Sequence, residues 1–208
     1  MGAAAGRGGT ARLLDWRAEH ERISRQAKLF DEAEQVRIVA DGTDLTLSVA
    51  GRKTDVDAGF GNMPGGEFFL CPVETSAEGT IAFTEFPARW HGRVLNDVRL
   101  RFEEGRVVDA SAETEEAYLI ETLDTDEGAR RIGELGIGCN PGIDRYLGNV
   151  HFDEKIHGTF HIALGMGFGY VGGTNESAIH WDIVKDLRPG GRIELDGRIV
   201  QADGVWLA

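Results

Sequence analysis

The feature that most constrains this chain is a hydrophobic pattern with a period of two, which begins after Glu34 and recurs along the sequence. Alternating apolar residues are typical of β-strands, because successive side chains of a strand point to opposite faces. Between such runs, hairpin turns are predicted at Asp41-Gly42, Glu104-Gly105 and Asp196-Gly197. The pattern predicts strands over residues 36–40, 45–49, 67–73, 80–86, 98–102, 106–110 and 159–164.

Three other segments have helical periodicity. Residues 13–35 place apolar side chains near one face and charged side chains around the rest, as in an amphipathic helix. Residues 112–121 and 126–135 are also predicted to be helices, the second behind a capping-box spacing of Asp124 and Glu127. The predicted fold class is therefore α+β, with a strand-rich mixed sheet or barrel-like domain and a few helices.

The same patterns suggest three parts. Residues 1–12 hold four glycines and no hydrophobic period, so we expect a flexible leader there. Residues 13–35 are expected to form a helix that either docks on the following domain or is what remains of a connection to a preceding one. Residues 36–208 are expected to form the domain that carries the chemistry.

Composition excludes some classes of partner. The 208 residues include 22 basic and 35 acidic side chains, a net charge of −13, which disfavours an extended nucleic-acid interface. No apolar run reaches the roughly 18 residues that a transmembrane helix needs, so we expect no membrane partner. Cys71 and Cys139 lack the spacing of a metal site and are interpreted as free thiols in a reducing cytoplasm.

The sequence contains no phosphate-binding loop, nucleophile elbow or His-Glu-x-x-His motif. Instead, carboxylates and imidazoles stand among glycines in four segments, residues 62–67, 133–138, 158–165 and 175–182. In an extended strand His180 and Asp182 point to the same side, while Trp181 faces the opposite way into packing. Oxygen and nitrogen ligands of this kind suit zinc, manganese, cobalt or iron.

The charges of the candidate ligands also fit a pair of metal ions. Three carboxylates and two neutral imidazoles carry −3, so two divalent ions leave +1 for a bridging hydroxide, as in a two-metal hydrolase. Each residue alone also has a structural interpretation. Glu67 suits a solubilising charge at a sheet rim, Glu134 a last-turn helix residue facing water, and His161 a hydrogen-bonded core histidine.

The motifs Asn62-Met63-Pro64-x-x-Glu67, Gly133-Glu134-Leu135-Gly136-Ile137-Gly138, Thr159-x-His161-x-Ala163-Leu164-Gly165 and His180-x-Asp182 occur in this order in a known family. Over residues 30–208 the chain resembles the C-terminal half of the thermophilic metallo-aminopeptidases, the family of aminopeptidases T and S. The resemblance implies a homodimer that binds two zinc, cobalt or manganese ions. The ligands it implies are Glu67, Glu134, His161, His180 and Asp182.

The sequence departs from the family in two respects. The resemblance implies an N-terminal α/β domain, and we expect residues 13–35 to be only the tail of its connection. Many members carry a catalytic tyrosine seven positions beyond the histidine that matches His161, where this chain has Phe168, which lacks the hydroxyl to bind an oxyanion. Tyr170 either takes over that role or is a packed aromatic residue. Glu154 either supports the ligands or is an exposed loop acid.

Together these observations predict a cytoplasmic aminopeptidase that hydrolyses the N-terminal bond of short peptides, with Glu134 as both metal ligand and proton shuttle. Two alternatives remain. One is a dihydroxypyridine-type dioxygenase with a single ferrous ion on His161, His180 and Asp182. The other is a metal-binding remnant without activity. Glu67 and Glu134 discriminate, because only a two-metal site needs both beside the other three residues.

Overall fold

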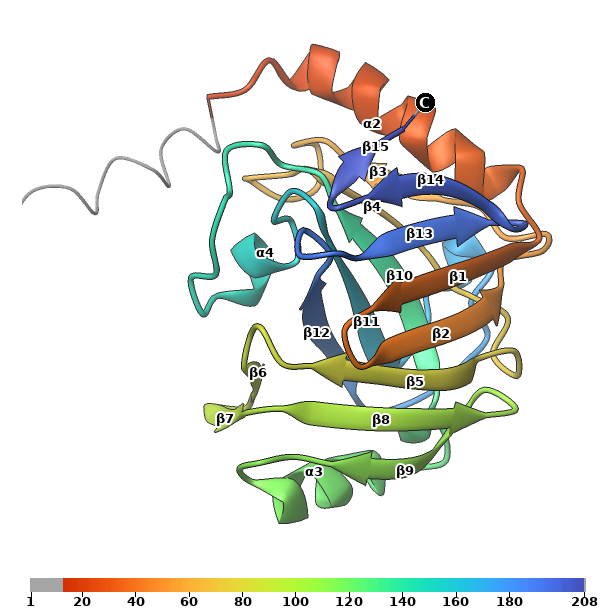
Figure 1. Ribbon diagram of the computed structural model, residues 1–208, viewed down its shortest axis with the longest axis vertical. Helices are drawn as coiled ribbons and strands as arrows, with labels where there is room; N and C mark the ends of the chain where they lie inside the picture. Colours follow the sequence, from red (N-terminus) through yellow and green to blue (C-terminus); the bar gives the residue numbers. More distant parts are fainter. Residues whose placement is uncertain (1–12, 208) are drawn as a thin grey trace, which may run out of the picture.

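Two antiparallel β-sheets packed face to face form the body of the protein, as seen in the computed structural model, which describes residues 13–207 (Figure 1). The larger sheet has the strand order β15-β14-β13-β1-β2-β5-β8-β9. Its strands are β1 (Gln35–Ala40), β2 (Thr43–Ser48), β5 (Glu78–Phe83), β8 (Val98–Glu103), β9 (Arg106–Ser111), β13 (Arg192–Leu195), β14 (Arg198–Ala202) and β15 (Val205–Trp206).

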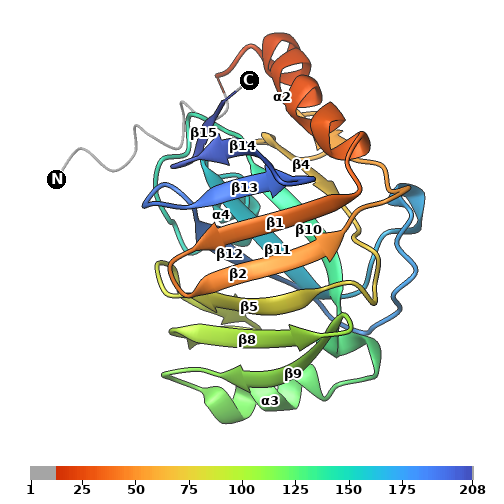
Figure 2. The ribbon, with the colours of Figure 1, turned by 45° about the vertical axis from the view of Figure 1, so that its right-hand side comes forward.

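The smaller sheet lies behind the larger one and has the order β12-β11-β10-β4-β3 (Figures 1 and 2). Its strands are β3 (Asp55–Asp57), β4 (Glu67–Leu70), β10 (Ile132–Gly138), β11 (Thr159–Gly165) and β12 (His180–Asp186). A separate hairpin pairs β6 (Ala88–Trp90) with β7 (Arg93–Leu95).

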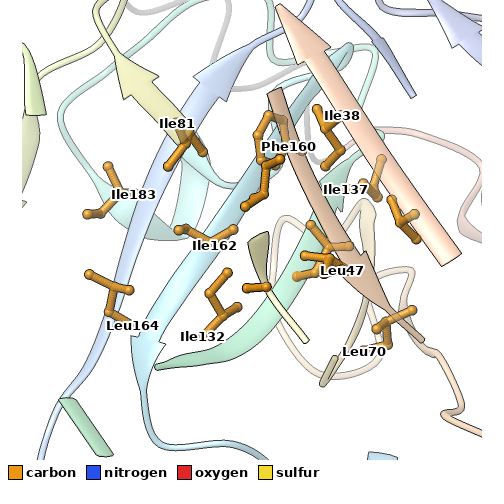
Figure 3. Close-up of a cluster of buried hydrophobic side chains, with 14 of the residues drawn as sticks. Ile38, Leu47, Leu70, Ile81, Ile132, Ile137, Phe160, Ile162, Leu164 and Ile183 are labelled. Carbon is orange, nitrogen blue, oxygen red and sulfur yellow. The ribbon is translucent and has the colours of Figure 1, made fainter. Parts of the chain in front are cut away.

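The hydrophobic core fills the space between the two sheets. Figure 3 shows side chains of both sheets meeting there, and those it labels are buried: Ile38, Leu47 and Ile81 from the larger sheet, and Leu70, Ile132, Ile137, Phe160, Ile162, Leu164 and Ile183 from the smaller. Burial of this apolar surface is the main favourable contribution to folding, at about 25 cal/mol per Å². One face of the smaller sheet therefore packs in the core, and only its opposite face is available to carry a functional site.

Helix α2 (Trp16–Asp31) confirms the predicted N-terminal helix. It begins at Asp15, whose carboxylate accepts hydrogen bonds from the backbone N–H groups of Arg17 and Ala18. Its buried residues Ile23, Ala27 and Phe30 face β3 and β4. The other helical segments are α3 (Glu116–Leu123), α4 (Val150–Asp153) and the 3₁₀ turns η1 (Gly128–Arg130) and η2 (Gly169–Val171).

The strand-rich α+β class is confirmed, and the named strands include all those that the alternation predicts. The three hairpin turns lie where the sequence placed them, and Glu104 and Asp196 take positive φ angles of 48° and 49° within them. The finer arrangement differs from the expectation. All pairs between named strands are antiparallel, not mixed, and neither sheet closes into a barrel.

The predicted helix over residues 126–135 is wrong. The segment forms η1 and then enters β10, so Glu134 lies in a strand and not at a helix end. Glycines at positions 133, 136 and 138 disfavour a helix, whereas a strand lets Leu135 and Ile137 face the core while Gly136 and Gly138 face away. The N-cap residue of η1 is Glu127, which makes no side-chain capping hydrogen bond, and Asp126 Oδ1 instead accepts from the backbone N–H of Ala129 at 2.9 Å.

The expected leader, residues 1–12, lies outside the described residues. The division into residues 13–35 and 36–208 remains a prediction, although α2 lies within the first of these ranges. Among the helices of residues 13–207, none combines the length and apolar character required to cross a membrane.

Candidate metal centre

Strand register brings the five predicted residues to one face of the smaller sheet. Cross-strand partners in an antiparallel sheet share a face. Gly138 pairs with Glu67, Gly136 with His161, and Glu134 with Ala163. On the next strand Ala163 pairs with Asp182, and Gly165 pairs with His180. The face that carries these residues is opposite to the hydrophobic core. Trp181, between the last two, is 1% exposed and packs in the core as predicted.

A β-bulge at Gly133 turns Glu134 toward this face. The register shifts between Ile132 and Glu134, so that Ile132 pairs with the core residue Leu164 while Glu134 pairs with Ala163. Without the extra residue of the bulge, positions 132 and 134 would face the same side. Gly133 has no room for a side chain, because a Cβ there would lie 2.3 Å from the carbonyl oxygens of Gly165 and Met166.

Gly136 makes room for the imidazole of His161. A Cβ on Gly136 would lie 2.1 Å from both Cε1 and Nε2 of that ring, so the histidine lies directly over the glycine. The glycines of the 133–138 segment therefore do more than form turns, which was one interpretation of the sequence. They provide a flat surface on which larger polar side chains from the neighbouring strands can converge.

The side chains approach one another closely around Glu134. Its Oε1 lies 3.1 Å from Nε2 of His161, and its Oε2 lies 3.5 Å from Nε2 of His180. Glu67 Oε2 lies 3.7 Å from His161 Nε2, and Asp182 Oδ1 lies 3.7 Å from His180 Nε2. Ligand atoms of Glu134, His161 and Asp182 all lie within 4.8 Å of one another. The structure thus brings all five predicted residues together.

Burial and mutual charge shift the protonation of this cluster. Burial alone would lower the pKa of His161, but the hydrogen bond to Glu134 and the charges of Glu67 and Asp182 raise it to about 10. Burial likewise opposes protonation of His180, but Glu134 and Asp182 raise its pKa to about 9. The two imidazoles hold the pKa of Glu134 down to about 2 despite its burial, which would raise it.

The two outer carboxylates show the opposite shift. Burial raises the pKa values of Glu67 and Asp182, although nearby cationic groups act in the opposite direction. The ammonium of Lys155, 2.8 Å from Glu67 Oε1, and protons on the two imidazoles supply the positive charge around these carboxylates. A divalent cation would replace those protons, which is the usual linkage between metal binding and proton release.

The donor atoms fit a divalent metal ion. Glu67 Oε2 and His161 Nδ1 are buried and without a hydrogen-bond partner among the described residues, so Glu67 keeps an acceptor free for a cation. Nδ1 of His180 donates to the carbonyl oxygen of Met166 at 2.8 Å, which turns Nε2 toward the carboxylates. Metal-binding histidines commonly fix their second nitrogen in this way.

A lysine and a third glutamate accompany the cluster. Lys155 is fully buried, and its Nζ lies 2.8 Å from Glu67 Oε1 and also contacts Glu154 Oε1. Burial, followed by the charge of Glu67, raises the pKa of Glu154 to about 8. The interpretation of Glu154 as an exposed loop acid is therefore wrong. Lys155 was missed, because a lysine in a loop has no periodicity or spacing that indicates burial.

An aromatic group borders the cluster beside His180. The Phe168 ring centre lies 4.9 Å from that of His180, and 5.7 and 5.9 Å from those of Tyr170 and Phe69. Tyr170 follows in η2 and is 68% exposed, with its ring 6.4 Å from Phe69. Its catalytic role stays a prediction.

Both cysteines are free and buried, which confirms their interpretation as thiols. Burial raises the pKa of Cys139 to about 12 and also raises that of Cys71. Neither thiol belongs to the group formed by the ligand atoms of Glu134, His161 and Asp182.

The two-sheet fold and this cluster of carboxylates and imidazoles are those of a β-sheet protein with a candidate metal-binding face. Within that class the sequence matches the family model of the thermophilic metalloproteases (M29) over residues 11–189, and the chain belongs to this family. The family suggested by the four motifs is thereby confirmed.

Two curated relatives and two solved structures give the extent of the similarity. The chain is 30% identical over 189 residues to aminopeptidase AmpS of Bacillus subtilis (strain 168), covering 76% of this chain and 45% of that protein. It is 32% identical over 164 residues to aminopeptidase T of Thermus aquaticus, covering 68% and 40%. The chain thus spans less than half the length of these curated relatives.

Wild-type AmpT from Thermus thermophilus has a TM-score of 0.81 and 25% identity, covering 93% of this chain and 55% of that one. The 2,5-dihydroxypyridine dioxygenase from Pseudomonas putida KT2440 has a TM-score of 0.79 and 20% identity, covering 97% and 62%. At that identity, the second similarity concerns the fold alone.

Proposed function

We propose that this chain is a metal-dependent aminopeptidase that hydrolyses the N-terminal bond of short peptides with two divalent ions, zinc, cobalt or manganese. One observation carries the proposal, namely the position of Glu134 between two imidazoles, 3.1 Å from His161 and 3.5 Å from His180. Each imidazole has a further carboxylate beside it, Glu67 in one case and Asp182 in the other. This gives two ligand sets that share Glu134.

When bound, the two ions would acidify a water molecule and polarise the scissile carbonyl. The chain's own residues supply the remaining steps. Glu134 lies beside both imidazoles and would accept the proton of the attacking water. It then passes that proton to the departing amine. A carboxylate at this cluster suits the free α-ammonium of a peptide, because it offers a negative charge for an ion pair.

The dioxygenase alternative needs only His161, His180 and Asp182 as ligands. Glu134 argues against it, because this carboxylate contacts both imidazoles and would crowd the open positions that oxygen and substrate require. Its one specific support is the fold similarity to the pyridine dioxygenase, at 20% identity. The inactive-remnant alternative rests on Phe168, which lacks a hydroxyl beside His180.

A metal count and a peptidase assay test the proposal. The metal-free protein is loaded with cobalt or zinc, desalted, and its bound metal measured by mass spectrometry, and leucine p-nitroanilide is the substrate. We expect about two ions per chain and metal-dependent release of nitroaniline. Glu134→Gln is expected to reduce kcat at least about 100-fold, the effect typical of a removed acid-base group. The matched control Glu121→Gln changes an exposed glutamate of α3.

Other outcomes distinguish the alternatives. One iron per chain with ring cleavage of a dihydroxypyridine would replace the hydrolase by the oxygenase. Two bound ions without any peptide cleavage would favour the remnant.

The proposal also covers the cellular location and the oligomeric state of the protein. The two free thiols support a reducing cytoplasm as the location. A homodimer is proposed from the family resemblance alone, and light scattering of the purified chain tests it.

A further inference from the structure

We propose that Lys155 competes with one of the two metal ions for Glu67, so that the ions bind with clearly unequal affinity. This inference rests on the proposed two-metal function. The ammonium of Lys155 lies 2.8 Å from Glu67 Oε1, an ion-pair distance. One of the two ligand sets therefore contains a carboxylate that already has a cation, and the protein supplies that cation itself.

The lysine is held where it is. Its side chain is fully buried, so the ammonium has lost its hydration and depends on the carboxyl groups beside it for compensation. Its backbone is also fixed, because its carbonyl oxygen accepts from the N–H of Asn140 at 2.9 Å and its own N–H donates to Phe152 at 3.1 Å. Glu154 contacts the ammonium from a second direction.

The two carboxylate oxygens of Glu67 are therefore not equivalent. Oε1 is occupied by the ammonium, and only Oε2, which is buried and has no hydrogen-bond partner among the described residues, remains for a metal. An ion bound there meets one ligand oxygen in place of two, and it is repelled by a positive charge only a few ångströms away.

The second ligand set lacks this competitor. Within residues 13–207, no lysine or arginine lies within 4.0 Å of the carboxylate oxygens of Glu134 or Asp182. The ion at Glu134, His180 and Asp182 is therefore the tight one, and the ion at Glu67 and His161 is the weak, exchangeable one. A hydrolase of this kind would be active only when the supply of metal is sufficient for the second ion.

A cobalt titration of the metal-free wild type provides the first test. Bound Co²⁺ is followed by its visible absorption and by calorimetry. We expect two steps whose dissociation constants differ at least about tenfold. Glu67→Gln is expected to remove only the weak step, and Asp182→Asn only the tight one. A single step that takes up two ions of equal affinity would overturn the inference.

A double variant provides the second test. Lys155→Met combined with Glu154→Gln removes the ammonium together with the acid that contacts it, which avoids leaving two buried carboxyl groups facing each other without a cation. We expect the weak step to tighten at least about tenfold and the tight step to stay within about threefold. The matched control is Lys185→Met with Glu85→Gln. Lys185 is also fully buried, and its Nζ lies 2.7 Å from Glu85 Oε1. This lysine pairs with the core residue Phe160 and so faces away from the metal cluster.

The results separate this inference from the proposed function. If the double variant at positions 154 and 155 folds, as judged by thermal unfolding, and its weak step is unchanged or weaker, Lys155 is not a competitor, whether or not peptides are cleaved. If that variant does not fold, the wild-type and Glu67→Gln titrations decide. If two unequal steps appear and the loaded enzyme cleaves no peptide, the proposed function fails and the metal competition stands.

Discussion

At the scale of single residues, the candidate centre depends on glycine as much as on its charged side chains. His161 can lie under the carboxylates only because position 136 has no Cβ, and Glu134 can face them only because Gly133 forms a bulge. These glycines have no ligand atoms, yet they fix the positions of residues that do. A substitution at either position should therefore affect metal binding more than its chemistry alone suggests.

Gly136→Ala tests this dependence. The added methyl group would lie 2.1 Å from the His161 ring, so the imidazole must move. We expect metal affinity to fall about 10- to 100-fold, as it does when a group that supports a metal ligand is lost. Stability should fall by about 1–3 kcal/mol from overpacking. Calorimetric metal titration and urea unfolding measure the two effects. Gly169→Ala is the control, because its Cβ would meet nothing within 4 Å, and an unchanged affinity in Gly136→Ala would contradict the prediction.

Tyr170→Phe tests the predicted catalytic hydroxyl. If Tyr170 stabilises developing charge on the substrate in place of Phe168, its loss should lower kcat about 100-fold and leave KM nearly unchanged. Steady-state kinetics on the metal-loaded protein measure both constants. Tyr118→Phe, on α3, serves as the control for loss of a hydroxyl. Equal kcat values in the two variants would exclude a catalytic role for Tyr170.

At the scale of elements, β10 contributes one face to the core and the other to the candidate metal centre. Leu135 and Ile137 pack in the core, while Glu134 and Gly136 face the cluster, and the bulge at Gly133 turns Glu134 to that side. Helix α2 supports the same sheet from the side. It contacts β3 and β4, and Arg22 Nη2 donates to the carbonyl oxygen of Cys139, just beyond the end of β10, at 2.6 Å.

Asp15→Ala tests the contribution of α2. Loss of the N-cap carboxylate leaves the backbone N–H groups of Arg17 and Ala18 without their acceptor, which typically costs about 1 kcal/mol. For a domain of this size we expect the unfolding temperature to fall by about 2–4 °C. Asp15→Asn keeps a good capping oxygen and should remain close to the wild type. Differential scanning calorimetry compares all three proteins, and an equal loss in both variants would point to charge, not capping.

At the scale of the whole molecule, the smaller sheet contributes both to the stability of the fold and to the candidate metal centre. The smaller sheet uses one face for the hydrophobic core and the opposite face for the cluster, so a shift in strand register would disrupt both. Metal bound at the cluster should therefore stabilise the entire fold and not only a loop.

Metal addition tests this link. At a free metal concentration about 100 times the dissociation constant, each ion should add about 2.7 kcal/mol to the free energy of unfolding. For a domain of this size we expect the unfolding temperature to rise by about 5–10 °C per ion. Thermal scans with and without Mn²⁺ measure the shift, and Glu134→Gln should lose most of it. A wild type insensitive to Mn²⁺ would separate the cluster from the stability of the fold.

Local patterns in the sequence identified α2, seven of the strands in the described residues, three hairpin turns, the opposite orientations of Trp181 and His180, and the motifs that carry the candidate ligands. These features depend on neighbours within a few residues, so periodicity and turn chemistry are sufficient to predict them.

The tertiary structure decided the rest. Residues 126–135 have a helix-like pattern of apolar residues, but pairing with β4 and β11 makes the latter part a strand. The bulge at Gly133, the contact of Gly136 with His161 and the burial of Lys155 against Glu67 all depend on strands that are distant in the sequence. A single sequence specifies such contacts only through the complete fold, because register and burial arise when separate strands pair.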